Sequence, residues 1–295
     1  GYAQLAIIVP LVMAAPRYFG GEMALGGLMQ TISAFGKVQD ALSYFVEAYG
    51  SIAEYAAVVR RLSGFTAHME EVDAKESAVA LSKSSGGLDV EGLCVSLPDG
   101  TELLQGCSFS LAPGEALLVT GASGAGKSTL LRALAGLWPF AHGRAAFPAD
   151  EKRLFLSQRP YLPLGTLARA VAYPLTAQGP REEMERALRL VGMEAFLARL
   201  DEVADWSHIL SLGEQQRIAF ARVLLVRPAW AFLDEATSAL DEAREKELYE
   251  MLARELPEMG VVSVGHRSTL RGQHGRELHL SGAGGFTTHV LAAST

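Results

Sequence analysis

The sequence predicts an α/β domain preceded by a helical segment that crosses a membrane. Strand-like and helix-like segments alternate from residue 88 to residue 282, which is typical of an α/β domain. Within that stretch, a glycine-rich loop lies between a short apolar strand and a helix. Residues 1–62, in contrast, are apolar and carry few charges. These three observations divide the chain into an N-terminal helical part and a C-terminal α/β domain.

The N-terminal part has the pattern of the end of a membrane domain. The apolar run that ends at Phe19 is shorter than the roughly 20 apolar residues of a spanning helix. Because the chain starts inside this run and has no initiator Met, we expect it to be a fragment of a longer protein. After the turn-rich GGEMALGG, no proline occurs from Leu25 to Arg61, which predicts one helix of about 54 Å. Arg60 and Arg61 then mark its cytoplasmic end.

One stripe of this predicted helix is polar. Its members recur at alternating steps of three and four: Gln30, Ser33, Lys37, Asp40, Tyr44, Glu47, Ser51 and Glu54. Polar groups at membrane depth usually face a bundle interior or a water-filled cavity, so the stripe predicts a hydrophilic path and a small, water-soluble cargo. The alternative is an amphipathic helix with one solvated face.

The rest of the chain divides into three further parts. Residues 63–87 are polar, end in Ser and Gly, and are predicted to be a linker. Residues 88–282 form the α/β domain, and residues 283–295 are predicted to be a tail. The net charge of −7, without a basic cluster, excludes a nucleic-acid surface. Cys94 and Cys107 lack metal-ligand spacing, and we expect buried thiols.

The loop GASGAGKST makes the predicted α/β fold a P-loop NTPase. It fits G-x-x-x-x-G-K-[ST], and it follows the strand-like ALLVT and precedes the helical TLLRALAGL. Glycines let backbone N–H groups approach phosphate oxygens, and the helix start adds its positive dipole end. Lys127 is expected to supply charge to the phosphates, and Ser128 a hydroxyl to Mg²⁺. The loop residues expected to bind ATP are Gly121, Ser123, Gly124, Gly126, Lys127, Ser128 and Thr129.

A second strand-like segment, AWAFLDEATSALD, carries two acidic residues at its carboxyl end. Ligands of open α/β sheets bind at such ends. We therefore expect Asp234 to be a partner of Mg²⁺ and Glu235 to polarise an attacking water.

Together these motifs resemble the nucleotide-binding domain of ABC transporters over residues 88–282. The resemblance implies an antiparallel β subdomain and a helical subdomain beside the P-loop core. Gln158 in FLSQRPYLPLGT matches the Q-loop, which contacts Mg²⁺ and the γ-phosphate, and His266 in SVGHRS matches the switch histidine. SALD, which ends at Asp241, matches the D-loop, and LSLGE at 210–214 matches the signature.

In this family each ATP lies between two subunits, so Ser211 and Gly213 are expected to complete the site of a second copy of the chain. Asp241 of the D-loop is also expected to bind the nucleotide. Two residues depart from the usual signature LSGGQ: Leu212 replaces a glycine and Glu214 replaces the glutamine. The aromatic residue that stacks on adenine is also missing near Leu97, so what contacts the base stays open.

A finer resemblance concerns the D-type branch of ABC transporters, on the segments APRYFGGEMALGGLMQTISAFGKVQDALSYF and ADWSHILSLGEQQRIAFARVLL. This branch includes peroxisomal acyl-CoA transporters, lysosomal cobalamin transporters and bacterial proteins that fuse an SbmA/BacA-like membrane domain to an ATPase. The layout implies that residues 1–19 end a fifth membrane helix and residues 22–61 form the sixth. It also implies a bacterial inner-membrane protein with a cytoplasmic ATPase domain.

The resemblance implies a homodimeric ATPase, dependent on ATP and Mg²⁺, that moves a peptide or a corrinoid-like cargo. One alternative is a transporter of lipid or acyl-CoA with the same machinery. The other is a soluble ABC ATPase of DNA repair or translation, which the net negative charge and the apolar N-terminal part disfavour. Cargo and direction of transport stay open.

Overall fold

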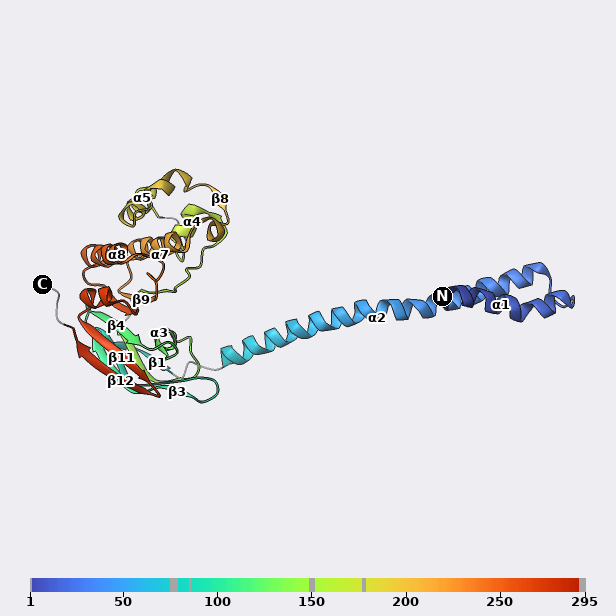
Figure 1. Ribbon diagram of the computed structural model, residues 1–295, viewed down its shortest axis with the longest axis horizontal. Helices are drawn as coiled ribbons and strands as arrows, with labels where there is room; N and C mark the ends of the chain where they lie inside the picture. Colours follow the sequence, from blue (N-terminus) through green and yellow to red (C-terminus); the bar gives the residue numbers. More distant parts are fainter. Residues whose placement is uncertain (1, 75–78, 85, 149–151, 177–178, 292–295) are drawn as a thin grey trace. The chain divides into compact units, whose positions relative to one another are not determined.

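The computed structural model describes residues 2–74, 79–84, 86–148, 152–176 and 179–291 (Figure 1). It divides into two compact units, residues 1–74 and residues 75–295.

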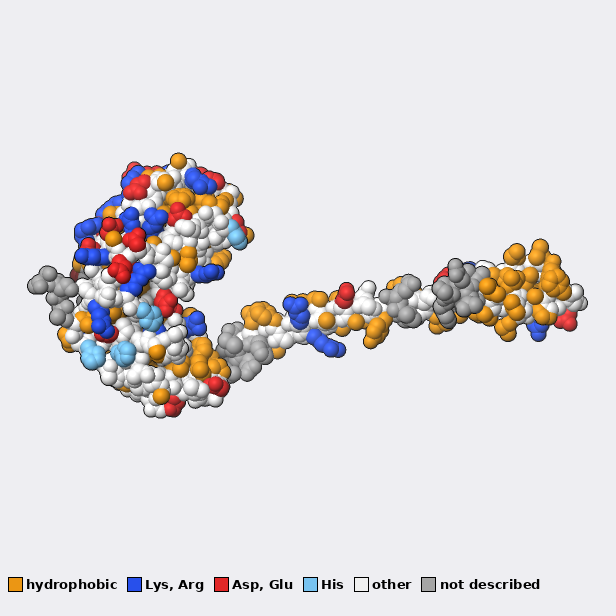
Figure 2. Space-filling model, in the orientation of Figure 1, with side chains coloured by type: hydrophobic (Ala, Val, Ile, Leu, Met, Phe, Trp, Pro, Cys, Tyr) orange, Lys and Arg blue, Asp and Glu red, His pale blue; other side chains and the backbone are white. Residues whose placement is uncertain are grey.

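The first unit is a pair of helices, α1 (Tyr2–Phe19) and α2 (Leu25–Ala74), joined by a short turn. Helix α1 packs against the beginning of α2 (Figure 1), and Ala14 and Leu28 are buried there. Most of the other apolar side chains of this unit whose burial is described are exposed, and Figure 2 shows them gathered where the two helices pair. None of the described helices combines the length and the hydropathy of a membrane span.

The core of the second unit is a six-stranded sheet in the order β12-β11-β4-β10-β9-β6. All neighbours in it are parallel except the pair β11 and β12. The strands are β4 (Ala116–Gly121), β6 (Arg153–Leu156), β9 (Trp230–Asp234), β10 (Gly260–Val264), β11 (Arg276–Gly282) and β12 (Gly285–Val290). The carboxyl ends of β4, β9 and β10 therefore lie at one edge, which is where the predicted site residues follow them.

A second, four-stranded sheet has the order β1-β5-β2-β3. Its strands are β1 (Val79–Ser84), β2 (Leu88–Ser96), β3 (Glu102–Leu111) and β5 (Ala141–Pro148), and β1 alone is parallel to its neighbour. This is the antiparallel β subdomain that the resemblance implied.

Alternate residues of the central strands pack into two apolar cores, because successive side chains of a strand point to opposite faces. On one face, Leu117 and Phe232 pack with the four-stranded sheet and with α3 (Lys127–Leu134). On the other face, Leu118 and Leu233 pack with α7 (Leu212–Val226) and α8 (Glu242–Glu255).

A helical region fills the chain between Gln158 and Ser211. It consists of α4 (Leu167–Ala172), α5 (Arg181–Leu190), the 3₁₀ helix η1 (Glu194–Arg199), α6 (Trp206–Ile209) and the short strand pair β7 (Gly165–Thr166) and β8 (Val203–Ala204). A second 3₁₀ helix, η2 (Ser268–Gln273), follows β10.

Two boundaries differ from the sequence prediction. Helix α2 runs through the first half of the predicted linker, to Ala74, and β1 lies in its second half, where it pairs with β5. Strand β12 lies in the predicted tail and pairs with β11. Each strand gains a ladder of backbone hydrogen bonds at a sheet edge, which its own composition does not reveal. Residues 75–78, 85 and 292–295 of the predicted linker and tail lie outside the described residues.

Candidate functional site

The P-loop connects β4 to α3 and is shaped by close backbone approach. Gly121 has φ +139°, and a Cβ there would lie 2.4 Å from the carbonyl oxygen of Leu280 on β11. Gly126, the N-cap of α3, has φ +96°. Because neither backbone conformation suits a residue with a side chain, the glycines determine the path of the loop.

Lys127 lies inside this loop and is only 7% exposed. Its Nζ donates to the carbonyl oxygens of Gly121, at 3.0 Å, and Ala122, at 2.9 Å. Burial lowers the pKa of Lys127, and the carboxylates of Glu235 and Asp234 act in the opposite direction. The ammonium group is thus held at the centre of the loop, beside two acidic groups, where a phosphate chain can reach it.

Ser128 and Asp234, the two residues predicted to hold a cation, lie in contact. The Ser128 hydroxyl donates to Asp234 Oδ1 at 2.7 Å, although the residues are far apart in sequence. Hydroxyl and carboxylate oxygens are the hard ligands that Mg²⁺ takes together with phosphate oxygens and water. These two residues therefore fit Mg²⁺ bound with a nucleotide. Thr129 follows them in the first turn of α3.

Glu235 and His266 extend from neighbouring parallel strands. Asp234 of β9 is in register with Val264 of β10, and the Glu235 N–H donates to the Val264 carbonyl oxygen at 3.2 Å. Glu235 has φ +50°, a left-handed conformation that is uncommon outside glycine and typical of functional sites. Its Oε1 lies 3.8 Å from His266 Nε2, and both side chains are partly exposed. The Glu235 carboxylate and the His266 imidazole thus lie next to each other near the P-loop, and both are accessible to solvent.

Gln158 contacts helix α7 through its backbone carbonyl. Its carbonyl oxygen accepts a hydrogen bond at 2.9 Å from Nε2 of Gln216. No hydrogen bond from its side chain to Ser128 or Asp234 is found among the described interactions, so its predicted contact with Mg²⁺ stays a prediction.

The signature segment begins helix α7. Ser211 is the N-cap, and it forms a capping box with Glu214. A Cβ at Gly213 would lie 3.3 Å from the carbonyl oxygen of Ala239, so the absence of a side chain lets the helix start approach the D-loop closely. Across the described residues, no hydrogen bond joins Ser211 or Gly213 to the P-loop. Asp241 caps the next helix, α8, by accepting from the Arg244 N–H at 2.8 Å.

Sequence reasoning missed the residue that joins these segments, Gln216. It is fully buried, and its Nε2 also donates to Ser238 Oγ at 3.1 Å, while its Oε1 accepts from the Ala239 N–H at 3.0 Å. One amide thus connects the Q-loop, the D-loop and the signature helix. The signal was a glutamine shortly before the apolar run that forms the inward face of α7.

Arg267 was also missed, although it follows the predicted switch histidine. Its guanidinium donates to the carbonyl oxygens of Leu240, at 2.6 Å, and Ser238, at 3.2 Å. It also lies 3.8 Å from Glu245, a carboxylate buried in α8. These contacts fix the D-loop to the segment that carries His266.

The region expected to contact adenine contains a tryptophan that the sequence analysis did not consider. Leu97 lies in a tight turn closed by the hydrogen bonds Leu97 N–H to Thr101 O and Gly100 N–H to Leu97 O. Next to it, Trp138 Nε1 donates to Ser96 O at 2.8 Å.

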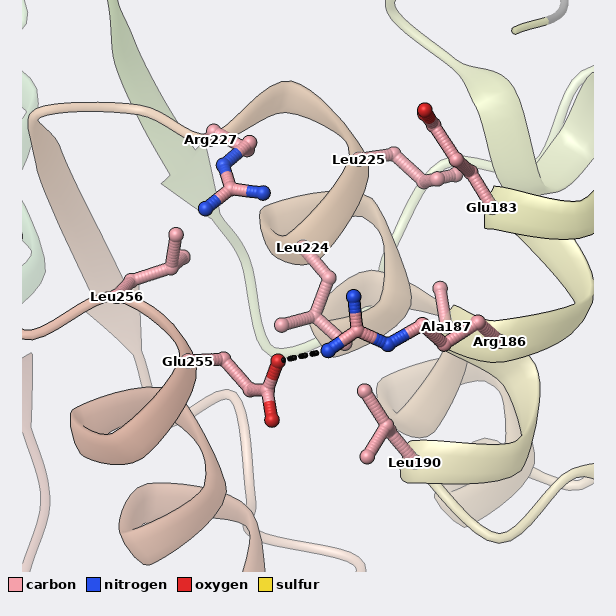
Figure 3. A pocket seen from close by; sticks show the side chains of 9 residues that line it. All are labelled: Glu183, Arg186, Ala187, Leu190, Leu224, Leu225, Arg227, Glu255 and Leu256. Atoms are coloured by element: carbon pink, nitrogen blue, oxygen red, sulfur yellow. Dashed lines mark hydrogen bonds and ion pairs between the residues drawn. The ribbon is translucent and has the colours of Figure 1, made fainter. Parts of the chain in front are cut away.

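A pocket of about 170 Å³ lies outside this cluster of residues, between α5, α7 and the end of α8 (Figure 3). Arg186 and Glu255 form an ion pair of 2.6 Å across it, and Leu224 and Leu190 form part of its wall (Figure 3). None of the predicted site residues lines it, so it is separate from the nucleotide site.

Comparisons with known proteins agree with these motifs. Residues 104–238 match the family described as ABC transporter, and residues 1–70 match the SbmA/BacA-like family. An uncharacterized ABC transporter ATP-binding protein of Haemophilus influenzae is 41% identical over 281 residues, which are 95% of this chain and 47% of that protein. The human lysosomal cobalamin transporter ABCD4 is 31% identical over 95% of this chain and 52% of that protein. The chain thus spans about half the length of these relatives.

Among solved structures, a bacterial Atm1-family ABC exporter with ATP bound is similar in fold. The TM-score is 0.63 at 23% identity, over 95% of this chain and 52% of that one.

Proposed function

Since the chain belongs to the ABC transporter family, with D-type and SbmA/BacA-like relatives, we propose that it is the ATP-hydrolysing part of a homodimeric membrane transporter. The observation that carries this proposal is the cluster at the carboxyl ends of β4, β9 and β10. There the P-loop lysine, the Ser128–Asp234 pair and the Glu235–His266 pair lie together.

Each group of the cluster has one role in the proposed hydrolysis of ATP. The P-loop N–H groups and Lys127 bind the phosphate chain. Ser128 and Asp234 would hold Mg²⁺, which would supply positive charge to the phosphate oxygens. Glu235 orients and polarises the attacking water, and His266, beside it, donates a hydrogen bond toward the γ-phosphate.

The second anion site, at Ser211 and Gly213, is proposed to serve the ATP of a second copy. This assignment is supported by the absence of hydrogen bonds from these two residues to the P-loop among the described interactions. A C2 dimer makes two equivalent composite sites, each with the P-loop of one subunit and the signature of the other.

Replacing Glu235 tests the hydrolytic assignment. Glu235→Gln keeps the shape of the side chain but removes its ability to polarise water, so ATP hydrolysis is expected to fall by roughly 100-fold or more. Binding of a fluorescent ATP analogue is expected to stay within about twofold, because Lys127 and the P-loop are intact. The matched control is Glu258→Gln, at an exposed position away from the cluster. A Glu235→Gln protein that hydrolyses ATP normally would contradict the proposal.

The first unit is proposed to be the end of the membrane domain, in a bacterial inner membrane with the ATPase unit on the cytoplasmic side. The match of residues 1–70 to the SbmA/BacA-like family and the exposed apolar side chains of α1 and α2 support this placement. Partition of the chain into detergent micelles or liposomes tests it. A chain that stays monodisperse in buffer without either would contradict it.

The cargo is proposed to be hydrophilic, a peptide or a corrinoid. The described members of the polar stripe on α2, including Gln30, Lys37 and Asp40, are exposed; the Glu47 side chain lies outside the described residues. The relative named as a lysosomal cobalamin transporter supports a corrinoid. Cobalamin or short peptides, but not acyl-CoA, are expected to stimulate ATP hydrolysis in liposomes. Stimulation by acyl-CoA alone would favour the lipid-type alternative.

A further inference from the structure

Glu214, one of the two departures from the usual signature, accepts a hydrogen bond from the Ser211 hydroxyl. Ser211 Oγ donates to Glu214 Oε2 at 2.7 Å, and the Ser211 N–H donates to the same oxygen at 2.8 Å. In return, the Glu214 N–H donates to Ser211 Oγ at 3.3 Å. The carboxylate therefore already occupies both donors of Ser211, the N-cap of α7, a 15-residue helix whose N-terminus attracts anions.

We propose that the Glu214 carboxylate is an internal anion that competes with the γ-phosphate of ATP for Ser211 and thereby weakens ATP-driven closure of the dimer. The inference rests on the proposed function, in which Ser211 and Gly213 receive the ATP held by the other subunit's P-loop.

The competition follows from the number of protons. A serine hydroxyl donates one hydrogen bond, so Ser211 cannot donate to Glu214 and to a phosphate oxygen at the same time. When the nucleotide approaches, Ser211 must turn from the carboxylate, and two negative groups are then left close together. Like charges in an interface oppose association.

The charge of Glu214 has no direct counter-ion in the part of the chain that is described. Arg217, one turn along α7, is close enough for the two charges to affect each other, but its guanidinium donates to the carbonyl oxygen of Gly192. A glutamine at position 214 would accept the same capping hydrogen bonds without a charge. The isosteric substitution Glu214→Gln therefore separates the effect of charge from the effect of the cap.

Light scattering of the full 295-residue chain in detergent tests the inference, in a Glu235→Gln background that keeps ATP intact. Adding Glu214→Gln is expected to lower the Mg·ATP concentration for half-maximal dimerisation by roughly fivefold, since both composite sites lose one repulsion. Binding of ATP to the monomer, measured with a fluorescent analogue at low protein concentration, is expected to stay unchanged, because Glu214 does not serve the chain's own P-loop. Glu258→Gln in the same background is the control.

The outcomes separate the two proposals. If the Glu235→Gln parent dimerises with Mg·ATP and Glu214→Gln leaves the half-maximal concentration unchanged or raises it, the charge of Glu214 does not oppose closure of the dimer and the inference is overturned. If Glu214→Gln changes binding to the monomer as much as dimerisation, Glu214 acts on its own site and the inference is overturned. If neither protein dimerises although both bind ATP, the proposed sharing of sites between subunits fails.

Discussion

At the scale of single residues, His274 shows how burial sets the pH range of stability. It is buried between α8 and β10, with Nδ1 against the Leu270 carbonyl oxygen at 2.7 Å and Nε2 against Ser263 Oγ at 2.9 Å. Tyr249 donates to the same Ser263 oxygen at 3.0 Å. A neutral ring that donates from Nδ1 and accepts at Nε2 satisfies this chain, whereas a proton on Nε2 would face the Ser263 proton.

Burial lowers the pKa of His274 to about 4, from the ordinary 6.5. Between these values the unfolded chain binds a proton that the folded chain excludes. The free energy of unfolding is therefore expected to fall by about 3 kcal/mol as the pH drops from 6.5 to 4. Urea unfolding at several pH values, compared with His274→Gln, measures this. His274→Gln is expected to be less stable at pH 7, but its free energy of unfolding should depend less on pH between 6.5 and 4. An equal pH dependence of the two proteins would contradict the lowered pKa of His274.

Gly121 and Gly124 allow a matched test of close approach in the P-loop. Both have positive φ, but a Cβ meets the Leu280 carbonyl oxygen at 2.4 Å only at position 121, and nothing within 4 Å at position 124. Gly124→Ala is expected to cost about 1 kcal/mol of unfolding free energy through backbone strain. Gly121→Ala adds a backbone clash and is expected to cost about 3 kcal/mol or more. Thermal denaturation without nucleotide measures the stability of both variants. Equal losses of stability would mean that β11 shifts to make room for the added Cβ at position 121.

The motif residues were predictable because their chemistry depends on local spacing. The P-loop spacing places Lys127 and Ser128 at the start of a helix, and an apolar strand ending in Asp234 places a carboxylate beside them. The roles of Gln216 and Arg267 depend on which loops the fold brings together, and a single sequence does not state that. Glu214 was visible as a departure, but its hydrogen bonds to Ser211 were not.

At the scale of elements, Gln216 holds α7 to the loops on both sides. Gln216→Leu removes a fully buried amide and leaves the Gln158 carbonyl oxygen and the Ala239 N–H without their side-chain partner. The expected cost is about 3 kcal/mol of unfolding free energy, with a lower kcat for ATP because the Q-loop and D-loop lose their common anchor. Thermal denaturation and steady-state hydrolysis measure the two effects.

The control for Gln216 is its neighbour. Gln215 donates to the carbonyl oxygens of Ser207 and Leu210 at 2.9 Å, but it is partly exposed, so water can replace its amide in Gln215→Leu. If Gln215→Leu lowers the free energy of unfolding as much as Gln216→Leu does, the burial of Gln216 does not explain the loss of stability.

The elements that sequence reasoning missed are edge strands. The segments VALSKS of β1 and GFTTHV of β12 contain no long apolar run, and the Ser- and Gly-rich stretches beside them are equally typical of a linker or a tail. Their stability comes from pairing with β5 and β11. The central strands β4, β9 and β10, buried on both faces, were predictable from continuous apolar runs. The extent of α2 was also underestimated, because its last turns carry polar residues and look like a linker.

At the scale of the whole molecule, the family was predictable from the order and spacing of motifs, and the comparisons confirm it. The cargo was not, because no motif of the sequence is tied to one cargo and the chain spans about half the length of its relatives. The proposed division of each ATP site between two subunits rests on the family resemblance and not on a single copy of the chain.

That division predicts complementation between two inactive chains. Lys127→Ala removes the lysine that binds phosphate in a chain's own site. Gly213→Arg places a large side chain at the start of α7, where the backbone lies close to the D-loop, and so blocks the site of the partner chain. In a mixed dimer, the Gly213→Arg chain supplies an intact P-loop and the Lys127→Ala chain an intact signature, so one of the two sites is whole. Each variant alone is expected to be inactive. An equal mixture, dissociated and reassembled, is expected to recover about a quarter of the wild-type hydrolysis, because half of the dimers are mixed and each has one working site. Sites contained within one subunit would give no recovery, and so the mixture decides between a shared and a self-contained ATPase.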